Sequence, residues 1–296
     1  MERYAWGAPV AIDLFLAGLG AAMFMIAVVA SLAGGKKYRR ITTTGALVAP
    51  WPVLLGVVLL IIDLGRPGRF WEMILRRGEA LNRLESPFIM FKIGSTMSIG
   101  IWLVVVLIIV SFIYLIVTIL AFPFKWAEKL QKIVGVIGVP FALLVTTYTG
   151  VLIAASNNAL WNNWMLPVIF VSSAIVTGIA GLTAVLALLQ ILKQDSAIGS
   201  EVHRLEKLNS RVILFQLVMV ILFIIIGIGS SPMRAMIGSA FGLLWWIGVI
   251  LFGLVVPLLV GFKGGTKSPS VAVLVSMLVL LGGFSLRYVI LIGGQI

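Results

Sequence analysis

Side chains that bind redox metals are nearly missing from the sequence, which has no cysteine and one histidine in 296 residues. Iron–sulfur clusters and covalently bound haem need cysteine, and a membrane haem b normally needs histidines that face each other inside a helix bundle. We therefore expect no haem, no iron–sulfur cluster and no other metal site in this protein. The one histidine, His203, stands in QDSAIGSEVHRLEKLNSR, which we interpret as a solvated loop.

Charge is scarce as well, because only 11% of the residues are charged whereas 61% are hydrophobic. This composition lies far outside that of soluble globular domains and predicts an integral membrane protein, in contact with membrane lipid and without a nucleic-acid partner. The apolar stretches are long enough to cross about 30 Å of hydrocarbon as helices, at about 1.5 Å per residue. They lack the alternating pattern of a membrane β-barrel. The predicted fold class is all-α and polytopic.

Eight spans are predicted within a single membrane domain, joined by short connections. The predicted ranges are 10–33, 46–64, 93–121, 132–155, 165–192, 211–230, 238–262 and 270–292. The loops that follow the odd-numbered spans hold 13 of the 22 basic residues. Because basic loops stay on the cytoplasmic side of a membrane, we expect both termini on the outer face.

One outward loop departs from this charge pattern. The segment GRPGRFWEMILRRGEALNRLESP, at 65–87, interleaves five arginines with three glutamates. It is either a short amphipathic helix at the membrane interface, held by ion pairs within the helix, or a docking surface for a partner protein. Mixed charges suit a specific contact between proteins better than lipid binding. The candidate docking residues are Arg69, Glu72, Arg76, Arg77 and Arg83.

Polar residues gather on the same outward side. Asp13 lies early in the first span, where an unpaired carboxylate raises the free energy of the folded protein. Such a residue therefore usually has a binding partner or a function. Tyr148 lies about two turns below an outward connection that contains Asn157, Asn158 and Trp161. An interfacial belt explains amides and indoles at this depth, but the buried tyrosine hydroxyl needs a partner. Brought together, these side chains would offer a quinone hydrogen bonds, a protonatable group and an apolar slot.

Three further ionisable residues invite a structural interpretation. Asp63 and Arg66 belong to DLGRP, where a carboxylate at a helix C-terminus opposes the helix dipole and Arg66 or Arg69 can neutralise it. The alternative for Asp63 is a role in a proton path. Arg287, in the eighth span, either pairs with a buried carboxylate or extends toward the membrane surface. We expect the pairing inside the bundle.

Five stretches of the sequence, taken in order, resemble a known family. They are WGAPVAIDLFLAGLGAAMF, LIIDLGRPGRFWEMI, SPFIMFKIGSTMSIGIWLV, YTGVLIAASNNALWNNWMLPVIFVSSAIVTGIAG and LRYVILIGGQ. Together they span nearly the whole sequence and resemble the NrfD/PsrC family, the membrane subunits of polysulfide reductase-like complexes in the cytoplasmic membrane of prokaryotes.

The resemblance implies an eight-helix subunit in two four-helix halves, which carries no metal cofactor and binds menaquinone or a related quinone near the outer face. It also implies two partners of anaerobic respiration. One is a ferredoxin-like subunit with several [4Fe-4S] clusters, and the other is a molybdenum or tungsten bis-pterin (molybdopterin) catalytic subunit beyond it. Tyr148, in the YTG element, matches a tyrosine that the family associates with the quinone. Asp13 stands where the family has a polar residue of the first helix.

The leading hypothesis is therefore quinone oxidation or reduction at an outward-facing site of an oxidoreductase complex, with protons exchanged through Asp13 and Tyr148. A transporter is the main alternative, with Asp13, Asp63, Lys92 and Arg287 as a proton or ion relay and no quinone chemistry. A bare membrane anchor without a quinone site is the third. The terminal substrate and the direction of electron flow depend on the catalytic subunit.

Overall fold

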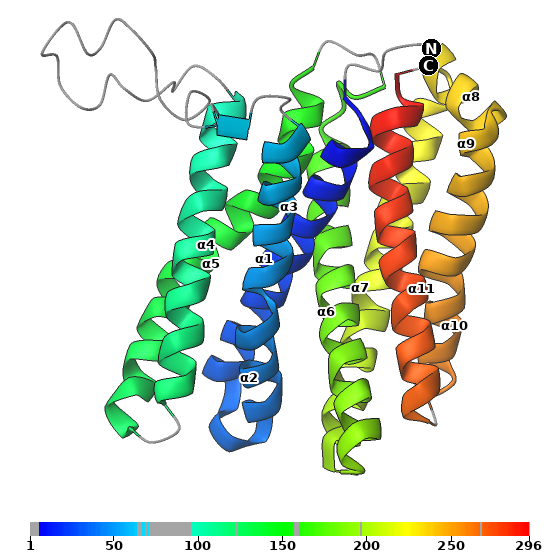
Figure 1. Ribbon diagram of the computed structural model, residues 1–296. Helices are drawn as coiled ribbons and strands as arrows, with labels where there is room; N and C mark the ends of the chain where they lie inside the picture. The colour runs from blue at the N-terminus through cyan, green and yellow to red at the C-terminus, as the bar shows by residue number, and fades with distance from the viewer. Residues whose placement is uncertain are drawn as a thin grey trace, which may run out of the picture.

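The helices of the protein stand side by side as long, roughly parallel rods in the computed structural model (Figure 1). It describes residues 6–63, 67–68, 70, 96–121, 124–156, 160–195, 197–266 and 268–295. Within these ranges eight helices are long and apolar enough to cross a membrane, and there is no β-strand. The predicted all-α fold with eight spans is confirmed.

The first half of the sequence supplies four of these spans, and the second span is built from two consecutive helices. The elements are α1 (Ala8–Gly34), the short 3₁₀ turn η1 (Gly35–Tyr38), α2 (Arg39–Val48), α3 (Pro50–Asp63), α4 (Thr96–Leu120) and α5 (Lys125–Ala154). Helices α2 and α3 follow one another directly, so that together they cross the membrane once.

The second half supplies the other four spans, and two of them include π-helical segments. The elements are α6 (Met165–Lys193), α7 (Ala197–Gly227), α8 (Ser231–Gly238), α9 (Ala240–Leu243), the π-helix η4 (Leu244–Val255), α10 (Val256–Phe262), α11 (Pro269–Tyr288) and the π-helix η5 (Val289–Gly293). The seventh span runs from α9 through η4 to α10, and the eighth from α11 into η5. The short helix α8 was not predicted.

The helices of each half pack mainly against one another, and the halves meet chiefly where α6 contacts α1 and α5 and where α11 contacts α1. Within each half, glycines allow the backbones of neighbouring helices to approach closely, as the small residues of the spans predict. A Cβ at Gly20 would lie 2.6 Å from the Ala49 carbonyl oxygen. A Cβ at Gly253 of η4 would lie 2.8 Å from the Cα of Gly282 on α11. Since lipid tails are as apolar as leucine, such tight packing is a main source of attraction between membrane helices.

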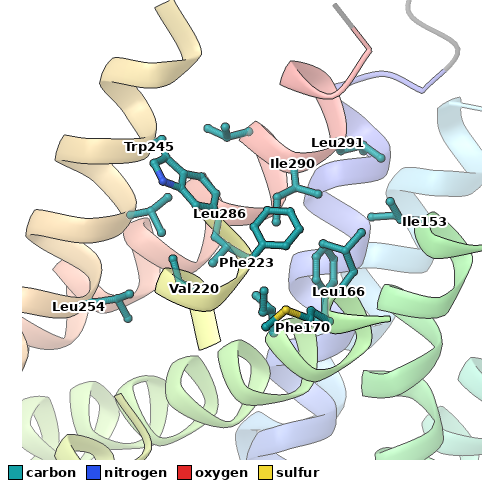
Figure 2. Packing of buried hydrophobic residues seen from close by; sticks show 14 of the residues in the cluster. Ile153, Leu166, Phe170, Val220, Phe223, Trp245, Leu254, Leu286, Ile290 and Leu291 are labelled. Atoms are coloured by element: carbon teal, nitrogen blue, oxygen red, sulfur yellow. The ribbon is translucent and has the colours of Figure 1, made fainter. Parts of the chain in front are cut away.

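Large side chains fill the interior of the second half (Figure 2). Phe170 of α6, Phe223 of α7, Trp245 of η4 and Leu286 of α11 are all fully buried and meet there. The rings of Phe223 and Trp245 lie 6.4 Å apart. This packing gives the second half a dense core.

Helix boundaries differ from the predicted spans where charged residues precede an apolar run. Helix α7 begins at Ala197, whereas the predicted span begins at 211. The first turns of α7 therefore contain His203, which is exposed but helical, so its assignment to a loop was wrong. The physical reason is that hydropathy reports the part of a helix that suits hydrocarbon, while backbone hydrogen bonding continues into the polar region.

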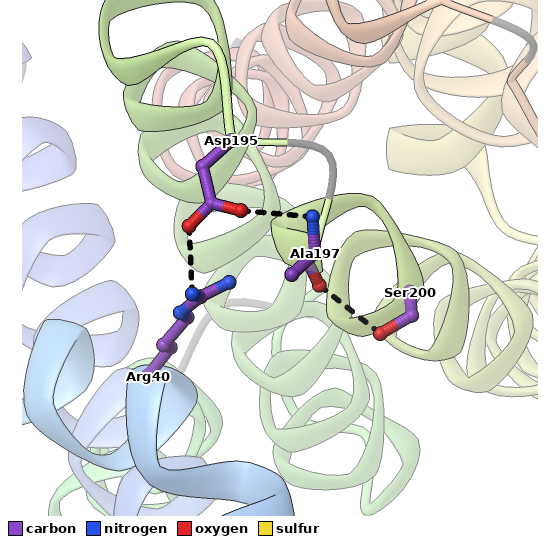
Figure 3. A network of polar contacts seen from close by, with 4 residues as sticks. All are labelled: Arg40, Asp195, Ala197 and Ser200. Carbon is purple, nitrogen blue, oxygen red and sulfur yellow. Dashed lines mark hydrogen bonds and ion pairs between the residues drawn. The ribbon is translucent and has the colours of Figure 1, made fainter.

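The two ends of the bundle carry different polar contacts. At one end, called here the terminal end (top of Figure 1), Trp6 and Gln295 are hydrogen-bonded to each other. At the opposite end Arg40 of α2 forms an ion pair of 2.7 Å with Asp195, which precedes α7 (Figure 3). The second carboxylate oxygen of Asp195 accepts a hydrogen bond of 2.9 Å from the Ala197 N–H and so caps α7.

Candidate functional site

A cavity of about 180 Å³ lies among the four spans of the first half, near the terminal end. Nearly all of its described lining residues are aliphatic or aromatic, and the two ionisable side chains among them are Asp13 and Tyr148. The lining residues are Trp6; Val10, Asp13 and Leu14 of α1; Val57, Leu60 and Ile61 of α3; Phe70; Met97, Gly100, Ile101, Val104 and Val105 of α4; and Tyr148 and Leu152 of α5. The predicted meeting of Asp13 with Tyr148 is therefore present in the structure.

Asp13 points from the second turn of α1 toward α3. Its neighbour on α3 is Gly56, where a Cβ would lie 2.7 Å from the Asp13 Oδ1 atom. A glycine at this position thus leaves room for the carboxylate. Among the described residues, no group donates a hydrogen bond to this carboxylate or pairs with it. A partly buried carboxylate of this kind is available to a ligand.

Tyr148 reaches the cavity from α5 by lying across α4. A Cβ at Gly100 of α4 would overlap the Tyr148 ring and its hydroxyl oxygen, so glycine makes this ring position possible. Within the described part of the sequence the hydroxyl has no hydrogen-bond partner. It is therefore a free donor among described lining residues that are apolar except for Asp13.

The cavity reaches the molecular surface. Two of its lining side chains, Met97 at the start of α4 and Phe70, are each 41% exposed. Ile61, near the end of α3, is partly exposed as well. The described side chains at the opening are apolar, which suits a molecule that arrives from the lipid phase.

Trp161 does not line the cavity, contrary to its predicted role in cofactor binding. Its indole is 5% exposed and stacks on Trp6, with ring centroids 5.8 Å apart and planes 18° from parallel. Its Nε1–H donates to the Ile290 carbonyl oxygen at 2.8 Å. Trp6 thus separates Trp161 from the cavity. Asn157 and Asn158 lie outside the described residues.

Residues 1–296 match the protein family that is described as "Polysulphide reductase, NrfD". The chain belongs to the NrfD family. It is 29% identical to Protein NrfD of Escherichia coli (strain K12) and 30% identical to a polysulfide reductase protein of Wolinella succinogenes. Each match spans 100% of this protein and 96% of the relative. It is also 25% identical to a selenate reductase protein of Mesobacillus selenatarsenatis, over 60% of this protein and 46% of that one.

The predicted family is thereby confirmed, and this NrfD-family protein is a multi-pass membrane protein. Two of its relatives carry names that mark them as one part of a reductase with several subunits, namely a polysulfide reductase and a selenate reductase. Membership in this family therefore associates the protein with membrane-bound oxidoreductase complexes.

Arg287 of this NrfD-family protein lies inside the second half, but its surroundings differ from the expectation. The side chain is fully buried, and Nη1 donates to the Ser173 hydroxyl and to the Gly283 carbonyl oxygen, both at 3.0 Å. The rings of Phe15 and Phe170 lie 5.6 Å and 5.4 Å from the guanidinium carbon. No carboxylate pairs with it in the part of the molecule that the structure describes. Aromatic faces and neutral oxygens hold the cation where a carboxylate was predicted.

Of the remaining predicted residues, the structure describes Asp63, which does not line the cavity. Asp63 is exposed at the end of α3, and it stands apart from Arg287, which is buried in the other half. The described positions therefore do not place these two residues in one relay. Several residues lie outside the described ranges, so their docking and neutralising roles stay predictions. They are Arg66, Arg69, Glu72, Arg76, Arg77, Arg83 and Lys92.

The sequence interpretation missed Trp6, Gly56 and Gly100 as site residues. A partial signal for Trp6 was present, since it stands just before α1, whose positions 10, 13 and 14 share one helix face and line the cavity. The two glycines gave no such signal. Their importance depends on which side chain of another helix lies opposite.

Proposed function

We propose that this protein is the quinone-binding membrane subunit of an oxidoreductase complex. It exchanges electrons between menaquinone or a related quinone and an iron–sulfur subunit docked at the terminal end. The observation that carries the proposal is the apolar cavity in which Asp13 and Tyr148 are the only ionisable side chains among the described lining residues. Such a cavity matches an apolar ring with two polar oxygens and a lipid-soluble tail.

The chemistry follows from these two side chains. A bound quinone supplies the exchange of two electrons and two protons. The Tyr148 hydroxyl donates a hydrogen bond to a ring oxygen and orients the ring. The Asp13 carboxylate accepts each proton when a quinol is oxidised and then releases it, and it delivers protons when a quinone is reduced. Asp13 is the only carboxylate among the described lining residues, so proton transfer depends on it in both directions, and it exchanges these protons with water at the outer face.

The isoprenoid tail of the quinone would lie against the exposed apolar side chains at the opening. Met97 and Phe70 border the cavity at the surface, where an isoprenoid tail can extend into lipid while the ring stays inside.

The partner subunits follow from the names of the relatives and from charge. A polysulfide reductase and a selenate reductase each include a protein like this one, which supports a catalytic partner subunit. We infer from the family resemblance that this partner carries a molybdenum or tungsten bis-pterin centre. Electrons would travel between it and the quinone through a ferredoxin-like subunit with several [4Fe-4S] clusters. The positive-inside rule places the terminal end, where that subunit docks, on the outer face of a prokaryotic cytoplasmic membrane.

The test measures quinol-linked turnover in membranes that contain the whole complex. The probe is 2,3-dimethyl-1,4-naphthoquinol, and turnover of the catalytic subunit with an artificial dye is the reference. Asp13→Asn removes the proton acceptor and Tyr148→Phe removes the donor. We expect Asp13→Asn to lower quinol-linked turnover by about 10²-fold or more, since general acid–base catalysis typically contributes about 10²- to 10⁴-fold. Tyr148→Phe should lower it by about 2- to 12-fold, the effect of one neutral hydrogen bond, and dye-linked turnover should stay unchanged in both.

Matched controls change the same chemistry away from the cavity. Glu128→Gln alters a carboxylate in the first turn of α5, and Tyr288→Phe alters a tyrosine of α11 that packs on Phe241. Both should turn over quinol like the wild type. Normal quinol turnover in the Asp13 and Tyr148 variants would remove the site assignment. A complex without bound quinone or quinol-linked turnover would favour a bare anchor.

A further inference from the structure

Trp6 stands between the cavity and the second half of the protein. It precedes α1 and lines the cavity, yet its neighbours come from distant parts of the sequence. Its indole stacks on Trp161, which is buried and fixed in turn by its hydrogen bond to the Ile290 carbonyl oxygen. One face of Trp6 is thus held by a ring that cannot move freely.

Gln295 holds the main chain of Trp6. The Trp6 N–H donates to Gln295 Oε1 at 3.2 Å, and Gln295 Nε2 donates to the Trp6 carbonyl oxygen at 3.0 Å. The same Nε2 atom donates to the Leu291 carbonyl oxygen at 2.8 Å, which ties the glutamine to η5. The amide therefore satisfies both polar groups of a residue that lies outside any helix.

The backbone at Gly294 packs closely against the stacked indoles of Trp6 and Trp161. A Cβ at Gly294 would overlap the Trp161 Nε1 atom, so the backbone passes next to the stacked indoles only because that residue is glycine. Trp6, Trp161, Gly294 and Gln295 are called here the indole clasp. The clasp fixes both the ring and the backbone of Trp6, and therefore the shape of the cavity wall that Trp6 forms.

We propose that Trp6 contacts the ring of the bound quinone and that Gln295 is a positioning residue that acts through Trp6. This inference rests on the proposed quinone site. An indole offers a broad, rigid face to an aromatic ring, and it loses little conformational freedom on binding when it is already held in place. The clasp makes that face available before the ligand arrives.

The test compares Trp6→Leu, Gln295→Leu and the double variant in membranes that contain the complete complex. We expect Trp6→Leu to raise the KM for 2,3-dimethyl-1,4-naphthoquinol by roughly 2- to 12-fold, the loss of one aromatic pair, with little change in kcat. Gln295→Leu should raise the KM by a smaller factor. The double variant should match Trp6→Leu alone, because a residue that acts only through Trp6 has no effect once the indole is gone.

Trp164→Leu is the matched control, because this tryptophan is 74% exposed and lies outside both the cavity and the clasp. Its KM should equal that of the wild type. Should the Gln295 variant fail to assemble, Trp6→Phe supplies a second measurement, in which quinone-dependent quenching of tryptophan fluorescence should fall below that of the wild type and of Trp164→Phe.

Two results would overturn the inference. One is a Trp6→Leu variant with an unchanged KM, and the other is a double variant whose effect equals the product of the two single effects. Both results can be distinguished from a result that refutes the proposed quinone site. If Asp13→Asn impairs quinol turnover while the clasp variants do not, only the clasp is refuted. If the wild type neither binds nor oxidises the probe, the proposed function itself is refuted.

Discussion

Gly100→Ala tests the geometry of the cavity with a single methyl group. Alanine favours an α-helix over glycine by about 0.5–1 kcal/mol, so the substitution by itself does not weaken α4. The added Cβ, however, would occupy the space of the Tyr148 ring and its hydroxyl oxygen. The ring must therefore turn away from its position across α4. Any loss of activity then reports on Tyr148 and not on helix formation.

The expected loss follows from what Tyr148 provides. A neutral hydrogen bond contributes about 0.5–1.5 kcal/mol, which corresponds to a factor of about 2–12 in kcat/KM. Tyr148→Phe removes only this bond, whereas Gly100→Ala also displaces the ring, which forms part of the wall of the cavity of about 180 Å³. We expect kcat/KM for 2,3-dimethyl-1,4-naphthoquinol to fall further in Gly100→Ala than in Tyr148→Phe, and dye-linked turnover to stay at the wild-type level.

Two comparisons make this result specific. Gly238→Ala is the control, because a Cβ there would meet nothing within 4 Å. In a Tyr148→Ala background the ring is absent, so Gly100→Ala should have no further effect. Wild-type kinetics in Gly100→Ala, or a loss that persists in the Tyr148→Ala background, would refute the position assigned to Tyr148.

Two predictions concern stability and are checked by unfolding of the purified protein in detergent. Arg40→Ala should lower the free energy of unfolding by only about 0.2–1 kcal/mol, because its pair with Asp195 is partly exposed, whereas Asp195→Ala should cost about 1 kcal/mol more through loss of the α7 cap. Equal losses would contradict the capping role. Arg287→Lys should lower the free energy of unfolding by about 1–3 kcal/mol, since an ammonium cannot keep both ring contacts and both hydrogen bonds. Arg287→Met should lower it by less, because methionine buries no charge. A lysine variant as stable as the wild type would contradict this account.

Hydropathy predicts the eight spans because every span needs about 20 apolar residues, a requirement that the sequence displays directly. It does not predict where the helices end. Helix α7 continues through charged residues from Ala197, and α8 (Ser231–Gly238) is too short to carry a hydropathy signal. Both depend on local backbone hydrogen bonds and on packing against neighbouring helices. The sequence therefore predicts the number and order of spans better than their bounds.

The site was predictable to the extent that a polar side chain in a membrane demands an explanation. Asp13 and Tyr148 were found for that reason, and they do share one cavity. Trp161 was assigned to the cofactor because it belongs to the same outward connection as the asparagines. Its neighbours in the structure are Trp6 and Ile290, which come from opposite ends of the sequence. No local sequence pattern predicts contacts of this kind.

Arg287 shows the same limit in another form. A buried cation predicts a counter-charge, and a carboxylate is the usual choice. The structure holds the guanidinium between Phe15 and Phe170 and gives it neutral oxygens from α6 and α11. Phenylalanines are common throughout the spans, so their number did not identify the two that face this cation. Only the packing of α1 against α6 and α11 does so.

The two halves of the protein differ in how they form the cavity. Its walls come from α1, α3, α4 and α5, while no described side chain of the second half lines it. The second half encloses a dense core in which Trp245 and Phe223 meet, and η4 approaches α11 closely at Gly253. Gln295 and Trp161 are each hydrogen-bonded to a carbonyl oxygen of η5, and both contact Trp6, so they connect the second half to the cavity wall. A change deep in the second half can therefore alter ligand binding by moving Trp6, by shifting α1 where it contacts α6 and α11, or by shifting α5 where it contacts α6.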